Sequence, residues 1–142
     1  MATIVFCEDD PKIGKLIGAA LRNSPHEVHL ATNGVDGLAL IERLRPAAVF
    51  TDVAMRGLDG LALLDRLKGH PGLAHIPVIL VTALLQRAQV EDGYRRGAAA
   101  IVRKPFSVAE LRACVERFAG GDDGPPGEAA RTPEGVCAHR EP

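Results

Sequence analysis

The sequence predicts one α/β domain in which a five-stranded parallel sheet carries helices on both faces. Five short apolar runs rich in β-branched residues recur along the chain, and segments with helical spacing separate them. Two of these runs, residues 47–51 and 78–82, are continuously apolar, as strands buried on both faces are. Strand and helix patterns that alternate in this way produce a parallel sheet. Each crossover helix returns the chain to the end of the sheet where the previous strand began, so the next strand runs in the same direction.

The five predicted strands comprise residues 3–7, 27–31, 47–51, 78–82 and 100–103. The second run alternates between polar and apolar residues, which indicates an edge strand. Pro77 stands directly before the fourth run, where the missing N–H suits the entry of a strand rather than its middle.

The segments between the strands have apolar residues at positions i, i+3 and i+4, which is typical of helices with one buried face. The periodic positions are Ile13, Leu16, Ile17, Ala20 and Leu21, then Leu38, Ile41 and Leu44, then Leu61, Leu64 and Leu67. Ser107 and Glu110 have the spacing of a capping box, so we expect the last helix to begin there. Gly97 lies where the fourth helix is expected to end.

The composition excludes several classes of function. The chain has 142 residues, 46% of them hydrophobic, and a formal net charge of −1, so it fits one globular domain without bulk attraction to nucleic acid. No apolar stretch is long enough to span a membrane and no signal peptide precedes the first strand, so we expect a cytoplasmic protein. Its three cysteines have no metal-finger spacing, and we expect them to be reduced.

The chain changes character after Phe118. Residues 120–142 contain nine Gly or Pro residues among 23, with five acidic and two basic side chains. Such a composition cannot bury enough apolar surface to fold. We therefore expect one domain over residues 1–119 and a disordered, acidic, Gly/Pro-rich tail over residues 120–142.

Polar residues stand at the carboxyl ends of four of the five predicted strands. Glu8 and Asp9 follow the first strand, Asp52 follows the third, Thr82 ends the fourth and Lys104 follows the fifth. In an open parallel sheet, these ends form the ligand crevice at the point where the strand order reverses. A strand order of 2-1-3-4-5 makes the first and third strands neighbours, which brings the three carboxylates together.

These residue types indicate phosphoryl transfer to a carboxylate. Three carboxylates in one crevice repel one another unless a cation intervenes, and Mg²⁺ prefers oxygen ligands of this kind. Asp52 is the best candidate for the nucleophile because it is central. Lys104 supplies a positive charge and Thr82 a hydroxyl for the transferred group. The predicted product is an aspartyl phosphate.

Four stretches of the chain, VFCEDDPKIGKL, DVAMRGLDG, VTA and KPF, occur in the order and at the intervals found in response regulator receiver domains. Over roughly residues 3–119 the chain resembles this family. The resemblance implies a flavodoxin-like (βα)5 doubly wound sandwich with strand order 2-1-3-4-5.

The resemblance also implies roles for individual residues. Glu8 and Asp9 are the acidic metal pair, and Asp52 is both the phosphoacceptor and a ligand of Mg²⁺. The backbone carbonyl of Ala54 is a further metal ligand. Thr82 is the switch hydroxyl, while Lys104 contacts the phosphoryl group and precedes a cis peptide bond to Pro105. By the same alignment, Asp10 caps the first helix.

By this resemblance, the chain is a stand-alone response regulator. It accepts a phosphoryl group from a sensor histidine kinase or a histidine phosphotransfer protein. It then signals to a downstream protein effector through the face formed by the fourth helix, the fifth strand and the fifth helix. It is not an enzyme beyond catalysing its own phosphorylation and dephosphorylation. We expect no nucleic acid or membrane partner, and a monomer or weak dimer.

Two positions depart from the family pattern. Ile101 stands where Tyr or Phe is usual, and Arg56 stands where Pro is usual. These departures keep an alternative open, namely a receiver-fold interaction module that acts independently of phosphorylation. Two other classes of protein, a nucleotide carrier and a phosphatase, fit the sequence less well. The loop after the first strand is too acidic for a flavodoxin-type nucleotide carrier, and the nucleophile lacks the DxD of aspartyl phosphatases.

Overall fold

The computed structural model describes residues 2–83, 86–120 and 137–138. Five parallel strands form the sheet in the order β2-β1-β3-β4-β5, which confirms the predicted fold class and strand order. Their bounds are β1 Thr3–Cys7, β2 Glu27–Ala31, β3 Ala48–Asp52, β4 Val78–Thr82 and β5 Ala100–Arg103. Only β3 differs from the predicted bounds. It begins one residue later and includes Asp52, which is therefore held by the strand itself.

The helices are α1 Pro11–Ala20, α2 Gly34–Leu44, α3 Gly60–Lys68, α4 Arg87–Arg95 and α5 Val108–Val115, which continues as the π-helical turn η1 Glu116–Gly120. Helices α1 and α5 begin at the predicted capping residues, whereas Gln86 before α4 makes no side-chain capping hydrogen bond. The Asp10 side chain accepts a hydrogen bond from the Lys12 N–H at 2.9 Å, so its predicted role as a helix cap is confirmed. The capping box of Ser107 and Glu110 is present at the start of α5.

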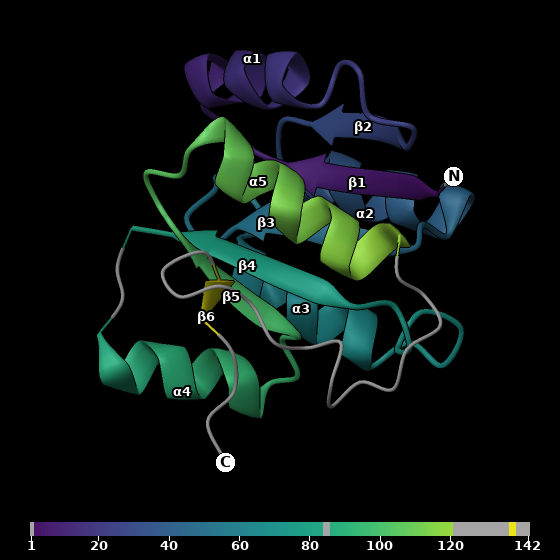
Figure 1. Ribbon diagram of the computed structural model, residues 1–142. Coiled ribbons are helices and arrows are strands. Elements are labelled where there is room, and N and C mark those ends of the chain that lie inside the picture. Colours follow the sequence, from purple (N-terminus) through teal and green to yellow (C-terminus); the bar gives the residue numbers. More distant parts are fainter. Residues whose placement is uncertain (1, 84–85, 121–136, 139–142) are drawn as a thin grey trace.

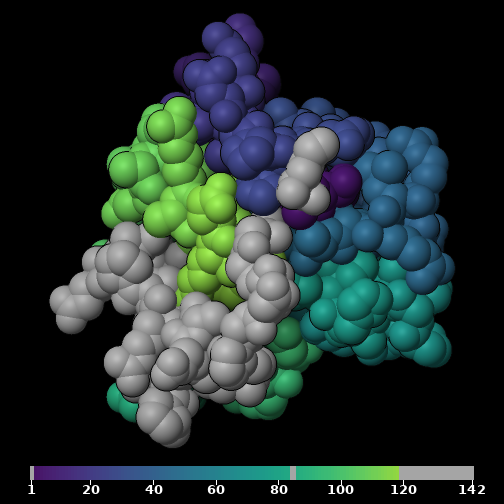
Figure 2. All heavy atoms as spheres, turned by 45° about the vertical axis from the view of Figure 1, so that its right-hand side comes forward, coloured from purple at the N-terminus to yellow at the C-terminus, as the bar shows by residue number. Residues whose placement is uncertain are grey.

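The helices cover the two faces of the sheet unequally (Figure 1). Helices α1 and α5 lie on one face, where Figure 2 shows the violet atoms of α1 bordering the green atoms of α5. Helices α2, α3 and α4 lie on the other face. Because helices cover both faces, the central strands are buried on both sides and only their ends reach solvent.

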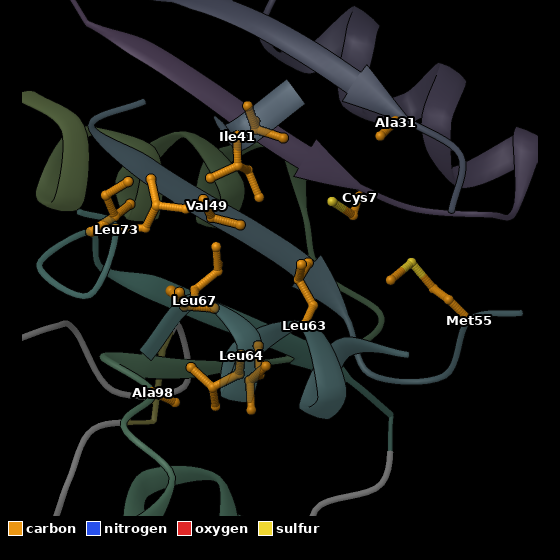
Figure 3. Close-up of a cluster of buried hydrophobic side chains, with 14 of the residues drawn as sticks. Cys7, Ala31, Ile41, Val49, Met55, Leu63, Leu64, Leu67, Leu73 and Ala98 are labelled. Carbon is orange, nitrogen blue, oxygen red and sulfur yellow. The ribbon is translucent and has the colours of Figure 1, made fainter. Parts of the chain in front are cut away.

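Each face of the sheet has its own apolar cluster. On the α1–α5 face, the rings of Phe6 and Phe50 stack with centroids 5.3 Å apart. On the opposite face, residues of α2 and α3 such as Ile41 and Leu63 pack against β3 (Figure 3). The burial of these side chains fixes the positions of β1 and β3 side by side.

A short sixth strand was not expected. β6 Cys137–Ala138 pairs antiparallel with the edge strand β5. These two residues and Gly120 at the end of η1 are the described part of the predicted tail over residues 120–142. Residues 121–136 and 139–142 lie outside the described residues, so the disordered tail stays a prediction. The backbone groups of an edge strand can pair with almost any extended segment, so composition alone does not reveal such a pairing.

The cysteines of the domain differ in their chemical state. Cys7 is a free, buried thiol at the end of β1. Cys114, buried on α5, is disulfide-bonded, so the expectation that all three cysteines are reduced is wrong. Spacing along the chain does not show which sulfur atoms the fold brings within bonding distance. Within the described residues, no helix has the length and apolar content needed to cross a membrane.

Glycine at the start of α2 lets the loop that follows β3 approach closely. A Cβ atom at Gly34 would overlap the Leu58 carbonyl group, whereas a Cβ at Gly18 on α1 would meet nothing within 4 Å. We expect Gly34→Ala to lower the free energy of unfolding by about 1–3 kcal/mol because the backbone must shift. Gly18→Ala, the matched control, should raise it by about 0.5–1 kcal/mol through helix propensity. Urea denaturation of both variants measures the difference, and an unchanged Gly34→Ala midpoint would contradict this packing.

Candidate functional site

The carboxyl ends of β1 and β3 bring together the three predicted acidic residues. Strands β1 and β3 pair in a register that places Cys7 opposite Thr51, so Glu8 and Asp52 follow as neighbours. Carboxylate oxygens of Glu8, Asp9 and Asp52 all lie within 4.8 Å of one another. The sequence therefore placed these residues in one cluster correctly, although they come from two distant segments.

Lys104 supplies the positive charge of the site from the loop after β5. Its Nζ atom lies 3.0 Å from Asp52 Oδ2, to which it donates a hydrogen bond, and 3.2 Å from Glu8 Oε1. The peptide bond from Lys104 to Pro105 is cis, as predicted. Burial alone would lower the pKa of Lys104. The hydrogen bonds to Asp52 and Glu8 and the negative charges of these two carboxylates outweigh burial, so the pKa of Lys104 is raised above its usual value. Lys104 is therefore a permanent cation near neutral pH.

The Glu8 side chain is fully buried beside two other carboxylates. Burial raises the pKa of Glu8 above its usual range, and the nearby Asp52 charge raises it further. Hydrogen bonding from the Asp10 backbone and the charge of Lys104 oppose this shift. Glu8 Oε1 forms an ion pair with the Lys104 ammonium group at 3.2 Å, and the same group donates a hydrogen bond to Asp52 Oδ2. One ammonium group shared by two buried carboxylates, with Asp9 beside them, leaves net negative charge in the cluster, which a bound cation offsets.

This donor set fits Mg²⁺. All three side chains offer carboxylate oxygens, the ligands that hard divalent cations prefer, and three protein carboxylates leave room for water and phosphate oxygens. Cys7, the neighbouring thiol, is not a competing ligand. Burial raises its pKa to about 12 despite an opposing hydrogen bond with the Thr51 side chain, so the thiolate that binds metals is scarce at neutral pH.

Thr82 and Lys104 lie at the same edge of the sheet. Thr82 ends β4 and pairs in register with Arg103, the residue directly before Lys104. Partly buried, Thr82 lines an apolar cavity of about 80 Å³ between α3, α4 and the sheet. The walls of this cavity also include Val90 of α4 and Ile101 of β5. Ile101 is only 3% exposed, so the aliphatic side chain at the usual aromatic position belongs to the core.

The model of one protein family, described as the response regulator receiver domain, matches residues 4–116 of the chain. The chain belongs to this family. The match covers the five parallel strands except Thr3 of β1, and it covers every residue of the cluster described above. Receiver domains are signalling modules of two-component systems, and the resemblance inferred from the four sequence stretches is confirmed.

Individual relatives agree with this assignment. The protein PilH of Pseudomonas aeruginosa is 32% identical over 121 residues, which cover 85% of this chain and 100% of PilH. The transcriptional regulator RpaA of Synechocystis is 33% identical over 115 residues, but the matched region spans only 48% of RpaA.

Among solved structures, the receiver domain of the sensor histidine kinase PA1611 from Pseudomonas aeruginosa superposes with a TM-score of 0.76 at 28% identity. The match covers 84% of this chain and 98% of that one. The PA1611 receiver domain has a magnesium ion coordinated in its active site cleft.

The structure adds one feature to the site that sequence reasoning missed. A groove of about 400 Å³ opens beside Asp9, and Arg56 forms part of its wall. The sequence showed Arg56 only as a departure from a usual proline. Its proximity to Asp9 depends on how the loop after β3 packs against the start of α2, which no local pattern encodes.

Neutralising Asp9 tests the repulsion within the cluster. In the presence of a chelator, we expect Asp9→Asn to raise the free energy of unfolding by about 1–2 kcal/mol, because one of three crowded charges is removed. The same variant should lose most of the stabilisation that Mg²⁺ gives the wild type. Thermal unfolding with and without Mg²⁺ measures both effects.

The exposed Glu42 on α2 provides a matched control. Glu42→Gln should leave both the midpoint in chelator and the Mg²⁺ response unchanged. If Asp9→Asn behaved like Glu42→Gln, the cluster would carry no such repulsion and hold no metal through Asp9.

Proposed function

We propose that the chain is a stand-alone response regulator that accepts a phosphoryl group on Asp52. The observation that carries this proposal is the Lys104 ammonium group, which lies 3.0 Å from Asp52 and 3.2 Å from Glu8 at the edge of a three-carboxylate cluster. A cation in contact with the nucleophile and a set of hard oxygen ligands beside it are the two elements that phosphoryl transfer to a carboxylate needs.

The proposed metal ligands are the side chains of Glu8, Asp9 and Asp52 and the backbone carbonyl of Ala54. When bound, Mg²⁺ offsets negative charge on the phosphoryl oxygens. The net negative charge of three carboxylates around one ammonium group supports this assignment. The magnesium ion in the receiver domain of PA1611, a relative at 28% identity, also supports it.

The protein side chains have separate tasks in this scheme. Asp52, fixed as the last residue of β3, attacks phosphorus in line with the departing group. Lys104 pairs with an oxygen of the transferred group. Thr82 donates its hydroxyl to another of these oxygens and moves toward it, which changes the wall of the cavity under α4. The new loop positions then favour one of two conformations of α4 and β5.

The proposed phosphodonor is a sensor histidine kinase or a histidine phosphotransfer protein, and the proposed output is a protein effector bound on the face of α4, β5 and α5. In this scheme the chain acts in the cytoplasm as a monomer or weak dimer, binds neither nucleic acid nor membrane, and catalyses only reactions of its own phosphoryl group.

Phosphorylation is tested directly by incubation with Mg²⁺ and a small phosphodonor, followed by intact mass measurement. We expect one phosphoryl group per chain in the wild type and none in Asp52→Asn, because the amide is not a nucleophile at this site. A chelator added before the phosphodonor should prevent formation of the phosphoryl adduct. An unmodified wild type under all these conditions would favour the interaction module that acts independently of phosphorylation.

The coupling role of Thr82 makes a separate prediction. Thr82→Ala should keep a phosphorylation rate within about threefold of the wild type, because Asp52, Lys104 and the metal ligands are intact. It should lose most of the phosphorylation-dependent shifts of backbone amide resonances in α4 and β5. Full shifts in the variant would show that the response does not pass through this hydroxyl.

A further inference from the structure

The groove beside the carboxylate cluster is formed by two loops at the same edge of the sheet. It has a volume of about 400 Å³ and is lined by the β2–α2 loop and the β3–α3 loop. The lining residues are Asp9, Thr32, Asn33, Val35, Arg56 and Gly57. Asp9 is shared with the carboxylate cluster, so the groove begins where the reaction site ends.

The loop that carries Arg56 is held on both sides. Met55 is 9% exposed and extends into the apolar cluster toward Cys7 (Figure 3). Gly57 has a φ of 75°, in the left-handed region that glycine adopts without strain. Leu58 lies against Gly34 at the start of α2. The backbone of Arg56 is therefore fixed at the groove, although its side chain is exposed.

Arg56 is a cation without an assigned partner. In the described part of the chain, its guanidinium group makes no ion pair or hydrogen bond, whereas Lys104 is engaged by Asp52 and Glu8. Arg56 is also the one basic residue among the described groove-lining residues. Asp9, the one acidic residue among them, belongs to the metal ligand set. The groove therefore offers a planar, multidentate donor for a carboxylate.

We propose that Arg56 forms a subsite for the carboxylate that departs from acyl phosphate donors, and that it favours these donors over phosphoramidates. This inference rests on the proposed function, since it requires Asp52 to accept the phosphoryl group. A loose transition state develops negative charge on the departing oxygen. A guanidinium group close to that oxygen stabilises the transition state more than the ground state and so raises the rate.

Acyl phosphates and phosphoramidates differ in the charge of the group that departs from phosphorus. With acetyl phosphate, Asp52 Oδ forms a bond to phosphorus while the bond from phosphorus to the acyl oxygen breaks. The electron pair stays on that oxygen, which leaves as acetate without needing a proton. With phosphoramidate, the bond from phosphorus to nitrogen breaks and the already protonated nitrogen leaves as neutral ammonia. Arg56 therefore aids the first reaction and not the second.

The experiment compares phosphorylation rates with acetyl phosphate and with phosphoramidate at saturating Mg²⁺. Arg56→Gln should slow the reaction with acetyl phosphate about fivefold, the size of an exposed charge interaction, and change the reaction with phosphoramidate less than about twofold. Arg56→Lys, which keeps the charge, should retain at least about half of the wild-type rate with acetyl phosphate. Arg66→Gln, which removes an exposed charge from α3 outside the groove, should leave both rates unchanged.

The ratio of the two rates separates the possible outcomes. A ratio that is unchanged in Arg56→Gln overturns the subsite, whether both rates stay constant or both fall together. An equal change of the ratio in Arg66→Gln also overturns it, because the effect would then be general electrostatics. A wild type that takes a phosphoryl group from neither donor overturns the proposed function and this inference with it.

Discussion

The contact of the Lys104 ammonium group with Asp52 and Glu8 is the interaction on which the site depends. Burying a carboxylate such as Glu8 costs desolvation free energy unless a positive charge compensates it. Lys104 reaches Glu8 because β5 ends at the same edge of the sheet as β1 and β3. One cation does not balance three carboxylates. The remaining negative charge favours a divalent cation at the same place.

The rest of the fold holds this charged edge in position. The apolar clusters on the two faces fix β1 beside β3, and Asp52 is held by strand pairing on both sides of β3. The loop after β3 is packed against the start of α2 through Gly34, which forms the groove at Arg56. On the other side of the edge, Thr82 and Ile101 border a cavity under α4. A cavity therefore lies beneath the helix proposed to move.

Much of this arrangement could be predicted from the sequence. Continuous apolar runs predicted the buried strands, and the polar residues that follow them predicted the site, because parallel strands bring their carboxyl ends to one edge. Features that depend on contacts between distant segments could not be predicted. The pairing of Cys137–Ala138 with β5, the disulfide at Cys114 and the groove between Asn33 and Arg56 have no periodicity or spacing that reveals them. The start of β3 was misplaced by one residue because Ala47 and Ala48 are indistinguishable in an apolar run.

The most direct test of the account is the location of a bound divalent cation in solution. Mn²⁺, which substitutes for Mg²⁺ at oxygen-ligand sites, broadens the amide resonances of nearby residues in an ¹⁵N-labelled sample. The account predicts that low concentrations of Mn²⁺ broaden residues 8–10 and 52–54 first and that excess Mg²⁺ reverses the effect. Broadening that begins at acidic groups elsewhere on the chain, or that Mg²⁺ does not reverse, would contradict it.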